Sequence, residues 1–152
     1  MSAPNEIINN RQAFHEFHIF DKYEAGAVLV GTEVKSIMAG RVQLKDSYVS
    51  LKDGEVWLMN AHISHYSHGN KQNHDPLRTR KLLLHRKEIE KLEKETVQKG
   101  MTLVVTAIYW KNGRIKFEIG VAKGKKLYDK RESEMRKTVE KETRQQLKEN
   151  TR

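Results

Sequence analysis

The chain has 152 residues, a formal net charge of +9 and a pI near 9.7, with 32% charged and 37% hydrophobic residues. This length fits one domain with some chain left over, and the positive charge favours a polyanionic partner such as nucleic acid. The lack of cysteine excludes disulfides, thiolate zinc sites and cysteine nucleophiles, and no apolar run has the length of a membrane span. We therefore expect a soluble, cytoplasmic protein with no membrane partner.

The first thirty residues carry weak signals. Residues 1–10 are polar and are expected to form a flexible lead. Apolar and aromatic residues between Arg11 and Phe20 predict a first strand. A bend is expected at 23–26, where the sequence is YEAG, and a second strand from Ala27 to Gly31.

A short helix is expected next. Val34, Ile37 and Met38 have helical spacing, with Thr32 as the expected cap. Gly40 is placed to end this helix.

Residues 47–60 alternate in polarity around Asp53-Gly54, a dipeptide that favours a two-residue hairpin turn. This turn sets Leu51 opposite Val56, so one face of the hairpin is apolar.

Residues 62–80 form a long stretch rich in His, Asn, Gly and Arg without periodicity, which is typical of a functional or disordered loop. Its histidines repeat the spacing HxxH, but only Asp75 is available to complete a zinc site. We therefore expect no metal and no other cofactor, and we interpret the histidines as contacts to phosphates or water. Lys81 to Leu84 then leads into a helix from His85 to Lys99, which Gly100 ends.

The strongest signal is a second hairpin around Asn112-Gly113, because a type I′ turn needs positive φ at both central positions. This turn sets Trp110 opposite Ile115 and Ile108 opposite Phe117. One face of the hairpin is then an apolar wall. Its predicted members are Val104, Ile108, Trp110, Ile115, Phe117, Ile119 and Val121.

From Lys123 to Arg152 the chain has eleven Lys and Arg against six Asp and Glu, a net +5 of the total +9. Its few apolar residues make only a thin helical stripe, and an isolated helix of this length is marginal in water. We expect a basic tail that is disordered alone and becomes helical against a partner.

The expected fold is mainly β, a small closed antiparallel barrel of the oligonucleotide-binding (OB) type with about three helices. The expected division is a lead at 1–10, the barrel at 11–123 and the basic tail at 124–152.

The residues contain no nucleophile–base set that the sequence forces together, so we expect a binding protein and not an enzyme. Basic side chains are the candidates for phosphate contacts. They are Arg78, Arg80, Lys81, Lys116, Lys125 and Lys126. Tyr66, Tyr109 and Tyr128 either stack on unpaired bases or are ordinary amphipathic surface residues.

Several motifs in order resemble one family, small protein B, the partner of transfer-messenger RNA. The matching segments are YEAG at 23–26, GTEVKS at 31–36, LKDSYV at 44–49, HIS at 62–64, GN…NHDP at 69–76, RKLLLH at 80–85, YWKNGRIKFEIG at 109–120 and GKKLYDKR at 124–131. The resemblance covers about Asn10 to Arg131. It implies a protein that binds the tRNA-like domain of transfer-messenger RNA and delivers it to stalled ribosomes in trans-translation.

The resemblance also implies roles for single residues. RNA contacts fall on Asn10, Glu24, Leu83 and Lys116. Because Glu24 repels phosphate, it either accepts hydrogen bonds from base amino or imino groups or orients nearby Lys and Arg. Leu83 either packs against an exposed base or belongs to the core.

Tail function, in the messenger channel and decoding centre of the small ribosomal subunit, is implied for a run at the start of the tail. These residues are Gly124, Lys125, Lys126, Tyr128, Asp129, Lys130 and Arg131. Elongation factor Tu is an implied indirect partner through the charged RNA. The alternative is a general OB-type single-strand RNA binder or ribosome-associated factor.

Overall fold

The computed structural model describes residues 5–67 and 73–125. This part of the chain forms nine strands, three α-helices and a π-helical turn, η2. In chain order they are β1 (Glu6–Asn9), α1 (Arg11–Glu16), β2 (Phe17–Ala27), α2 (Gly31–Met38), β3 (Val42–Gln43), β4 (Tyr48–Lys52), β5 (Glu55–Met59), β6 (His62–Ile63), β7 (Arg80–Leu83), α3 (Arg86–Glu93), η2 (Lys94–Gln98), β8 (Thr102–Lys111) and β9 (Arg114–Gly124).

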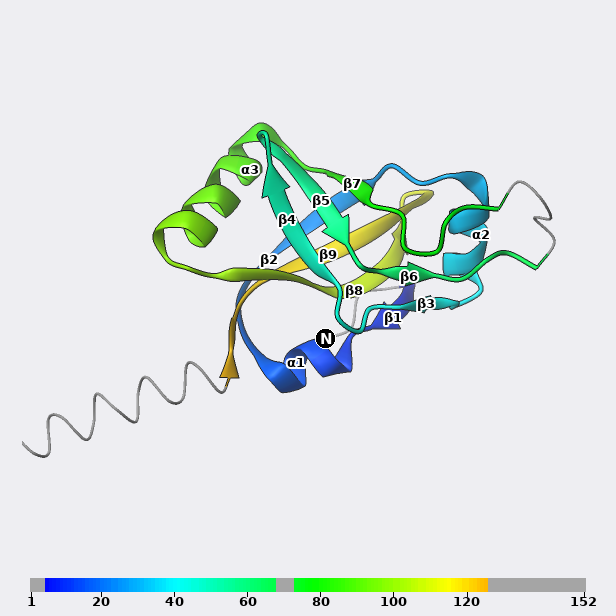
Figure 1. Ribbon diagram of the computed structural model, residues 1–152, viewed down its shortest axis with the longest axis horizontal. Helices are drawn as coiled ribbons and strands as arrows, with labels where there is room; N and C mark the ends of the chain where they lie inside the picture. Colours follow the sequence, from blue (N-terminus) through cyan, green and yellow to red (C-terminus); the bar gives the residue numbers. More distant parts are fainter. Residues whose placement is uncertain (1–4, 68–72, 126–152) are drawn as a thin grey trace, which may run out of the picture.

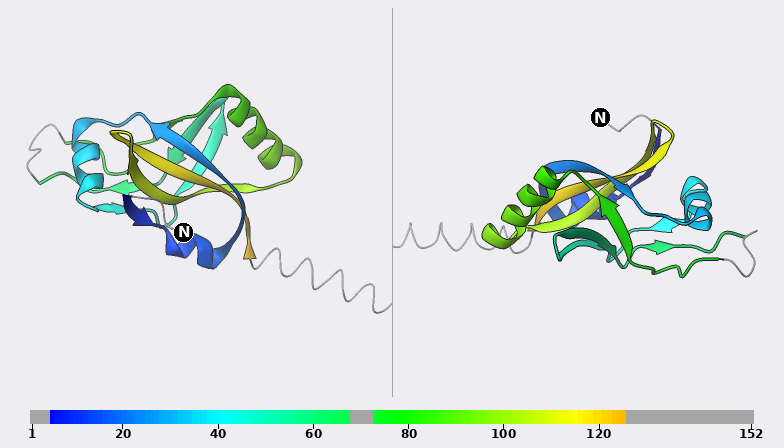
Figure 2. Two further views of the ribbon diagram at one scale, coloured as in Figure 1. Left: turned by 180° about the vertical axis from the view of Figure 1, so that it is seen from behind. Right: turned by 90° about the horizontal axis from the view of Figure 1, so that it is seen from above.

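Seven strands form one antiparallel sheet in the order β1-β8-β4-β5-β7-β2-β9, and pairing of β8 with β9 closes it. The predicted small closed barrel is therefore confirmed. Figure 1 shows α3 at one end of the barrel and α2, with the small β3–β6 pair, at the other. The two further views in Figure 2 agree with this arrangement. Within the described ranges, no helix is both long enough and apolar enough to cross a membrane.

Both predicted hairpin turns are present. Asn112 and Gly113 have φ of 51° and 75°, and Asp53 and Gly54 have φ of 54° and 74°. Positive φ at both central positions matches the right-handed twist of the flanking strands. The predicted registers are confirmed, with Trp110 opposite Ile115 and Leu51 opposite Val56 among the paired residues.

The core fills the barrel and reaches under both end helices. Phe117 and Ile108 of the main hairpin are fully buried, as are Ile37 of α2 and Leu92 of α3. The two predicted helices are therefore confirmed, but the predicted cap is wrong, because Thr32 lies inside α2, which begins at Gly31. Its preceding residue, Val30, donates its backbone N–H to the Glu33 carboxylate at 2.9 Å.

The prediction of a flexible lead is wrong for its last residues. Glu6–Asn9 forms β1 and pairs with β8, with Ile8 opposite Ile108. Asn10 then caps α1, because its Oδ1 accepts a hydrogen bond from Ala13 N at 3.3 Å. Four residues carry too short a pattern to predict a strand, and the pairing segment lies about a hundred positions away in sequence.

The strand predicted between Arg11 and Phe20 is confirmed only from Phe17 onward, and the predicted bend at 23–26 is wrong. The strand predicted from Ala27 to Gly31 is also wrong, because β2 ends at Ala27 and α2 begins at Gly31. Residues 11–16 are helical, and β2 then runs without interruption through 23–26, where the bend was expected. Its pairing with β9 has one irregularity, between Ile19 and Asp21. Lys81 to Leu83, the segment that leads into the predicted helix, belongs to strand β7.

Val104 does not belong to the predicted apolar wall. A register shift between Val105 and Ala107 reverses which side chains face the core in the preceding part of β8. Val105 therefore faces the main core, and Val104 joins a small second cluster with Ala13 and Ala122, beneath α1. A bulge moves side chains to the opposite face, which strict alternation cannot foresee.

Candidate RNA-binding groove

A groove of about 750 Å³ lies between β2, β7, the start of α3 and the tip of the β8–β9 hairpin. Three of the predicted RNA contacts line it, Glu24 from β2, Leu83 from β7 and Lys116 from β9. These residues are far apart in sequence. The antiparallel pairing of β2 with both β7 and β9 brings them to one surface.

Leu83 is 49% exposed, so it is not a core residue, and its apolar side chain is available to a ligand. Gly26 lies beside it. A Cβ at Gly26 would be 3.6 Å from Leu83 Cβ and 3.9 Å from Lys116 Nζ. An apolar side chain and a cation therefore border the same point of the groove, a combination that suits a base and its phosphate.

Glu24 lies close to three donors of the main hairpin. Its Oε2 accepts hydrogen bonds from Tyr109 Oη at 2.5 Å and from Lys111 Nζ at 3.0 Å. The Tyr109 hydrogen bond holds the pKa of Glu24 below its ordinary value; burial opposes this, while Lys111 and Lys116 reinforce it. Glu24 is therefore a fixed, ionised acceptor, and it holds Lys111 beside it in turn.

Tyr109 is only 7% exposed, so neither alternative for it, a base-stacking ring or an ordinary surface residue, is correct. Burial, followed by the contact with Glu24, raises the pKa of its phenol. Tyr66 has Lys35 Nζ at 5.2 Å from its ring centre, and Tyr128 lies outside the described residues.

Asn10 lies away from the groove. Its Nδ2 donates to Val105 O at 2.8 Å and its backbone N–H donates to Thr106 O at 2.8 Å. Together with the cap of α1, these bonds join the N-terminal segment to β8. The contacts give Asn10 a structural role, and its predicted RNA contact stays a prediction.

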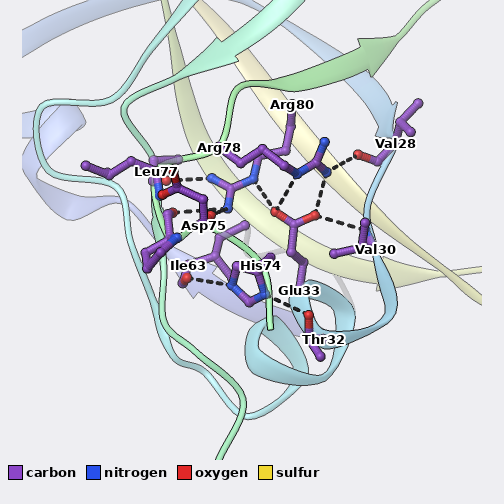
Figure 3. Close-up of polar contacts among 12 residues, drawn as sticks. Val28, Val30, Thr32, Glu33, Ile63, His74, Asp75, Leu77, Arg78 and Arg80 are labelled. Atoms are coloured by element: carbon purple, nitrogen blue, oxygen red, sulfur yellow. Dashed lines mark hydrogen bonds and ion pairs between the residues drawn. The ribbon is translucent and has the colours of Figure 1, made fainter. Parts of the chain in front are cut away.

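Arg80 cannot contact phosphate from its position in the fold, and this prediction is wrong. The residue is 0% exposed. Its Nε donates to Glu33 Oε2 at 2.5 Å, and its terminal nitrogens donate to three backbone carbonyl oxygens, those of Ala61, Asp75 and Pro76 (Figure 3). Arg80 is the centre of a buried polar cluster that joins α2 to the loop before β7.

Arg78 belongs to the same cluster but reaches the surface. It donates to Glu33 Oε1 at 2.5 Å and to Val28 O at 3.1 Å, and its side chain is one-third exposed (Figure 3). Burial alone would raise the pKa of Glu33, but hydrogen bonds from Arg78, the Val30 N–H and Arg80 lower it. Lys81 lies outside the cluster, with Nζ 2.8 Å from Glu55 Oε1 on the surface.

One histidine of the 62–80 segment has a structural role. His74 is buried, and its ring lies 2.8 Å from both Thr32 Oγ1 and Ile63 O (Figure 3). The interpretation of the histidines as phosphate or water contacts is therefore wrong for this residue. In residues 5–67 and 73–125, no group of three or more His, Cys, Asp or Glu is arranged to hold a metal ion.

Sequence reasoning missed three other residues that line the groove, His85, Trp110 and Arg114. Trp110 was assigned to the apolar wall, and it is only partly buried against the core. Its position beside the hairpin turn was the available signal, since residues near a tight turn reach the rim of a barrel. Arg114 adds a second cation on the same hairpin.

The predicted tail residues lie at the limit of the described structure. Gly124 ends β9 opposite Phe17, and Lys125 follows it. The remaining predicted tail residues lie outside the described ranges. They are Lys126, Tyr128, Asp129, Lys130 and Arg131.

Comparison with known proteins is consistent with this geometry. The family model for "SmpB protein" matches residues 7–149. The SsrA-binding protein of Ligilactobacillus salivarius is 54% identical over 144 residues, covering 95% of this chain and 93% of that protein. The SsrA-binding protein of Acetivibrio thermocellus is 56% identical over 146 residues, covering 96% and 95%.

A chain from the solved structure "tmRNA-SmpB: a journey to the center of the bacterial ribosome" has the same fold. Its TM-score is 0.67 at 45% identity, and the match covers 79% of this chain and 85% of that chain. The family model spans nearly the whole sequence, and both relatives match it at almost full length. The chain belongs to the SmpB protein family.

Proposed function

We propose that this protein binds the tRNA-like domain of transfer-messenger RNA and delivers it to stalled ribosomes for trans-translation. One observation carries the proposal: Glu24, Leu83 and Lys116, the RNA contacts implied by the family motifs, line a single groove. The relatives named SsrA-binding protein and the tmRNA-SmpB structure support the choice of RNA.

The groove provides the chemistry of RNA binding. Lys116 and Arg114 supply positive charge for phosphates, Leu83 and Trp110 supply apolar contact, and Glu24 supplies a hydrogen-bond acceptor. The protein is thus a non-enzymatic RNA carrier. We assign the protein to the bacterial cytoplasm, where ribosomes act. Elongation factor Tu is an indirect partner through the charged RNA.

The basic tail completes the proposed mechanism. Its excess of Lys and Arg complements ribosomal RNA, and we assign it to the empty messenger channel and decoding centre of the small subunit. In this assignment, the tail occupies the channel while the barrel stays bound to its own RNA.

A competition assay at physiological salt tests the RNA partner. Labelled tRNA-like domain is challenged with excess bulk tRNA and with single-stranded RNA of equal length. We expect the complex to resist both competitors, and Lys116→Ala to weaken it more than Lys87→Ala. Lys87 is an exposed lysine of α3 outside the groove, so this control removes the same charge. Equal competition by single-stranded RNA would instead identify a general RNA binder.

Truncation tests the division of labour between barrel and tail. Because β9 extends to Gly124, the chain is cut after Lys125 and not within the strand. We expect this variant to keep its affinity for the tRNA-like domain and to lose tagging of nascent chains on stalled ribosomes. Loss of RNA binding on truncation would contradict the proposal that the groove is the main RNA site.

A further inference from the structure

The two carboxylate oxygens of Glu24 have different surroundings. Oε2 accepts both hydrogen bonds, from Tyr109 Oη at 2.5 Å and Lys111 Nζ at 3.0 Å. Within residues 5–67 and 73–125, no donor is bonded to Oε1. One oxygen is therefore occupied by the protein, and the other is available to a ligand.

Glu24 also lies between two hollows of the surface. The larger one is the groove with Leu83 and Lys116. The smaller one, about 300 Å³, is lined by Tyr109, Lys111 and Glu24 itself. Both donors to Oε2 thus belong to the smaller hollow, and neither lines the groove.

We infer that Tyr109 is a positioning residue, whose hydroxyl fixes the Glu24 carboxylate so that Oε1 accepts a hydrogen bond from an unpaired base in the groove. The inference rests on the proposed function, since it concerns the same groove and the same RNA. An ionised carboxylate only accepts hydrogen bonds and repels phosphate, so its ligand is an amino or imino N–H of a base. Tyr109 itself does not touch the RNA, because it is buried.

Charged groups around Glu24 come from each neighbouring strand. Lys111 extends from β8, and Lys116 and Glu118 extend from β9, with Glu118 directly opposite Glu24. Lys22 of β2 is 3.9 Å from Glu118 and partly balances it. Among these contacts, the Tyr109 hydrogen bond is the largest cause of the low pKa of Glu24.

A double-mutant cycle on the full chain tests the inference, with the labelled tRNA-like domain as the probe. Tyr109→Phe keeps the buried ring and removes only the hydroxyl. We expect it to weaken binding about three- to tenfold, the effect of losing one hydrogen bond of ordinary net strength. In the Glu24→Gln background, the same change should have almost no further effect, because the carboxylate that Tyr109 positions is no longer there.

Thr106→Val is the matched control. Thr106 Oγ1 of β8 donates to Glu118 Oε2 of β9 at 2.7 Å, so this variant also removes a β8 hydroxyl that donates to a carboxylate on a neighbouring strand. Neither Thr106 nor Glu118 lines the groove. We expect RNA affinity to stay within about twofold of wild type.

RNA binding measured against pH gives a second test, because a purely structural role of Tyr109 would not change its pH dependence. Wild-type binding should persist to low pH, because Glu24 stays ionised above its lowered pKa. Tyr109→Phe raises that pKa, so binding should be lost at higher pH as the solution is acidified from about pH 7 to about pH 4. The difference between the two profiles should vanish in the Glu24→Gln background.

The outcomes separate the two claims. If wild type does not prefer the tRNA-like domain, the proposed function fails, whatever the variants do. If wild type prefers it but Tyr109→Phe weakens binding equally in both backgrounds, or leaves it unchanged, the positioning role of Tyr109 is overturned.

Discussion

Replacing Arg80 by methionine should destabilise the fold without weakening the RNA groove. The change keeps an unbranched side chain and removes the guanidinium from a site with no exposure. Glu33 loses its bond at 2.5 Å, and three carbonyl oxygens lose their donors. Breaking a buried ion pair costs about 3–5 kcal/mol. Because Arg78 still holds Glu33, we expect the lower end, about 3 kcal/mol.

Urea denaturation measures this loss. With an m-value of about 1.5–2 kcal/mol/M, the midpoint should fall by about 1.5–2 M. Lys81→Met is the control, since it makes the same change to a cation at the next position. The Lys81–Glu55 pair is 38% and 44% exposed, so its loss should cost about 0–1 kcal/mol.

RNA binding supplies the test of the reasoning. Without urea, and under conditions where Arg80→Met remains folded, the affinity of this variant for the tRNA-like domain should match wild type within about twofold. An Arg80→Met protein that is as stable as Lys81→Met but binds RNA poorly would refute the structural role. Arg80 would then be a phosphate contact after all.

Three other predictions follow from single contacts. Lys116→Ala should reduce the slope of log K against log salt for RNA binding by about one, and an unchanged slope would remove Lys116 from the phosphate contacts. Gly120→Ala should lower the free energy of unfolding by about 1–3 kcal/mol, because the new Cβ would lie 2.8 Å from Thr106 Cγ2. Its control, Gly31→Ala, meets no atom within 4 Å and should be neutral or stabilising in thermal unfolding. Stability in urea should fall as pH drops below the ordinary Glu pKa of 4.5, because Glu33 has a lowered pKa in the folded protein. Glu33→Gln should be less stable at neutral pH and show a shallower pH dependence.

Local rules predicted the parts of the fold whose signals are contained in a few adjacent residues. The dipeptides Asn112-Gly113 and Asp53-Gly54 fix turn type and register at once, since positive φ selects the residue types. The helix at 31–38 followed from apolar spacing, and Gly40, with φ of 74°, ends it. These elements need no distant partner to be recognised.

Elements that depend on a distant partner were mispredicted. Glu6–Asn9 is a strand only because β8 offers it an edge, and 23–26 is extended because β9 pairs with it throughout. The bulge in β8 that turns Val104 to the second cluster is likewise set by its pairing with β9.

For the candidate site, the sequence by itself determined the class of ligand and the hairpin that carries Lys116. Composition fixes net charge, and a two-residue turn fixes which side chains share a face. Only the tertiary structure decided that Arg80 is buried while Leu83 is exposed, although both lie in the same short strand. Burial is a property of what packs against a strand, and no pattern within RKLL distinguishes the guanidinium that meets Glu33 from one that meets RNA.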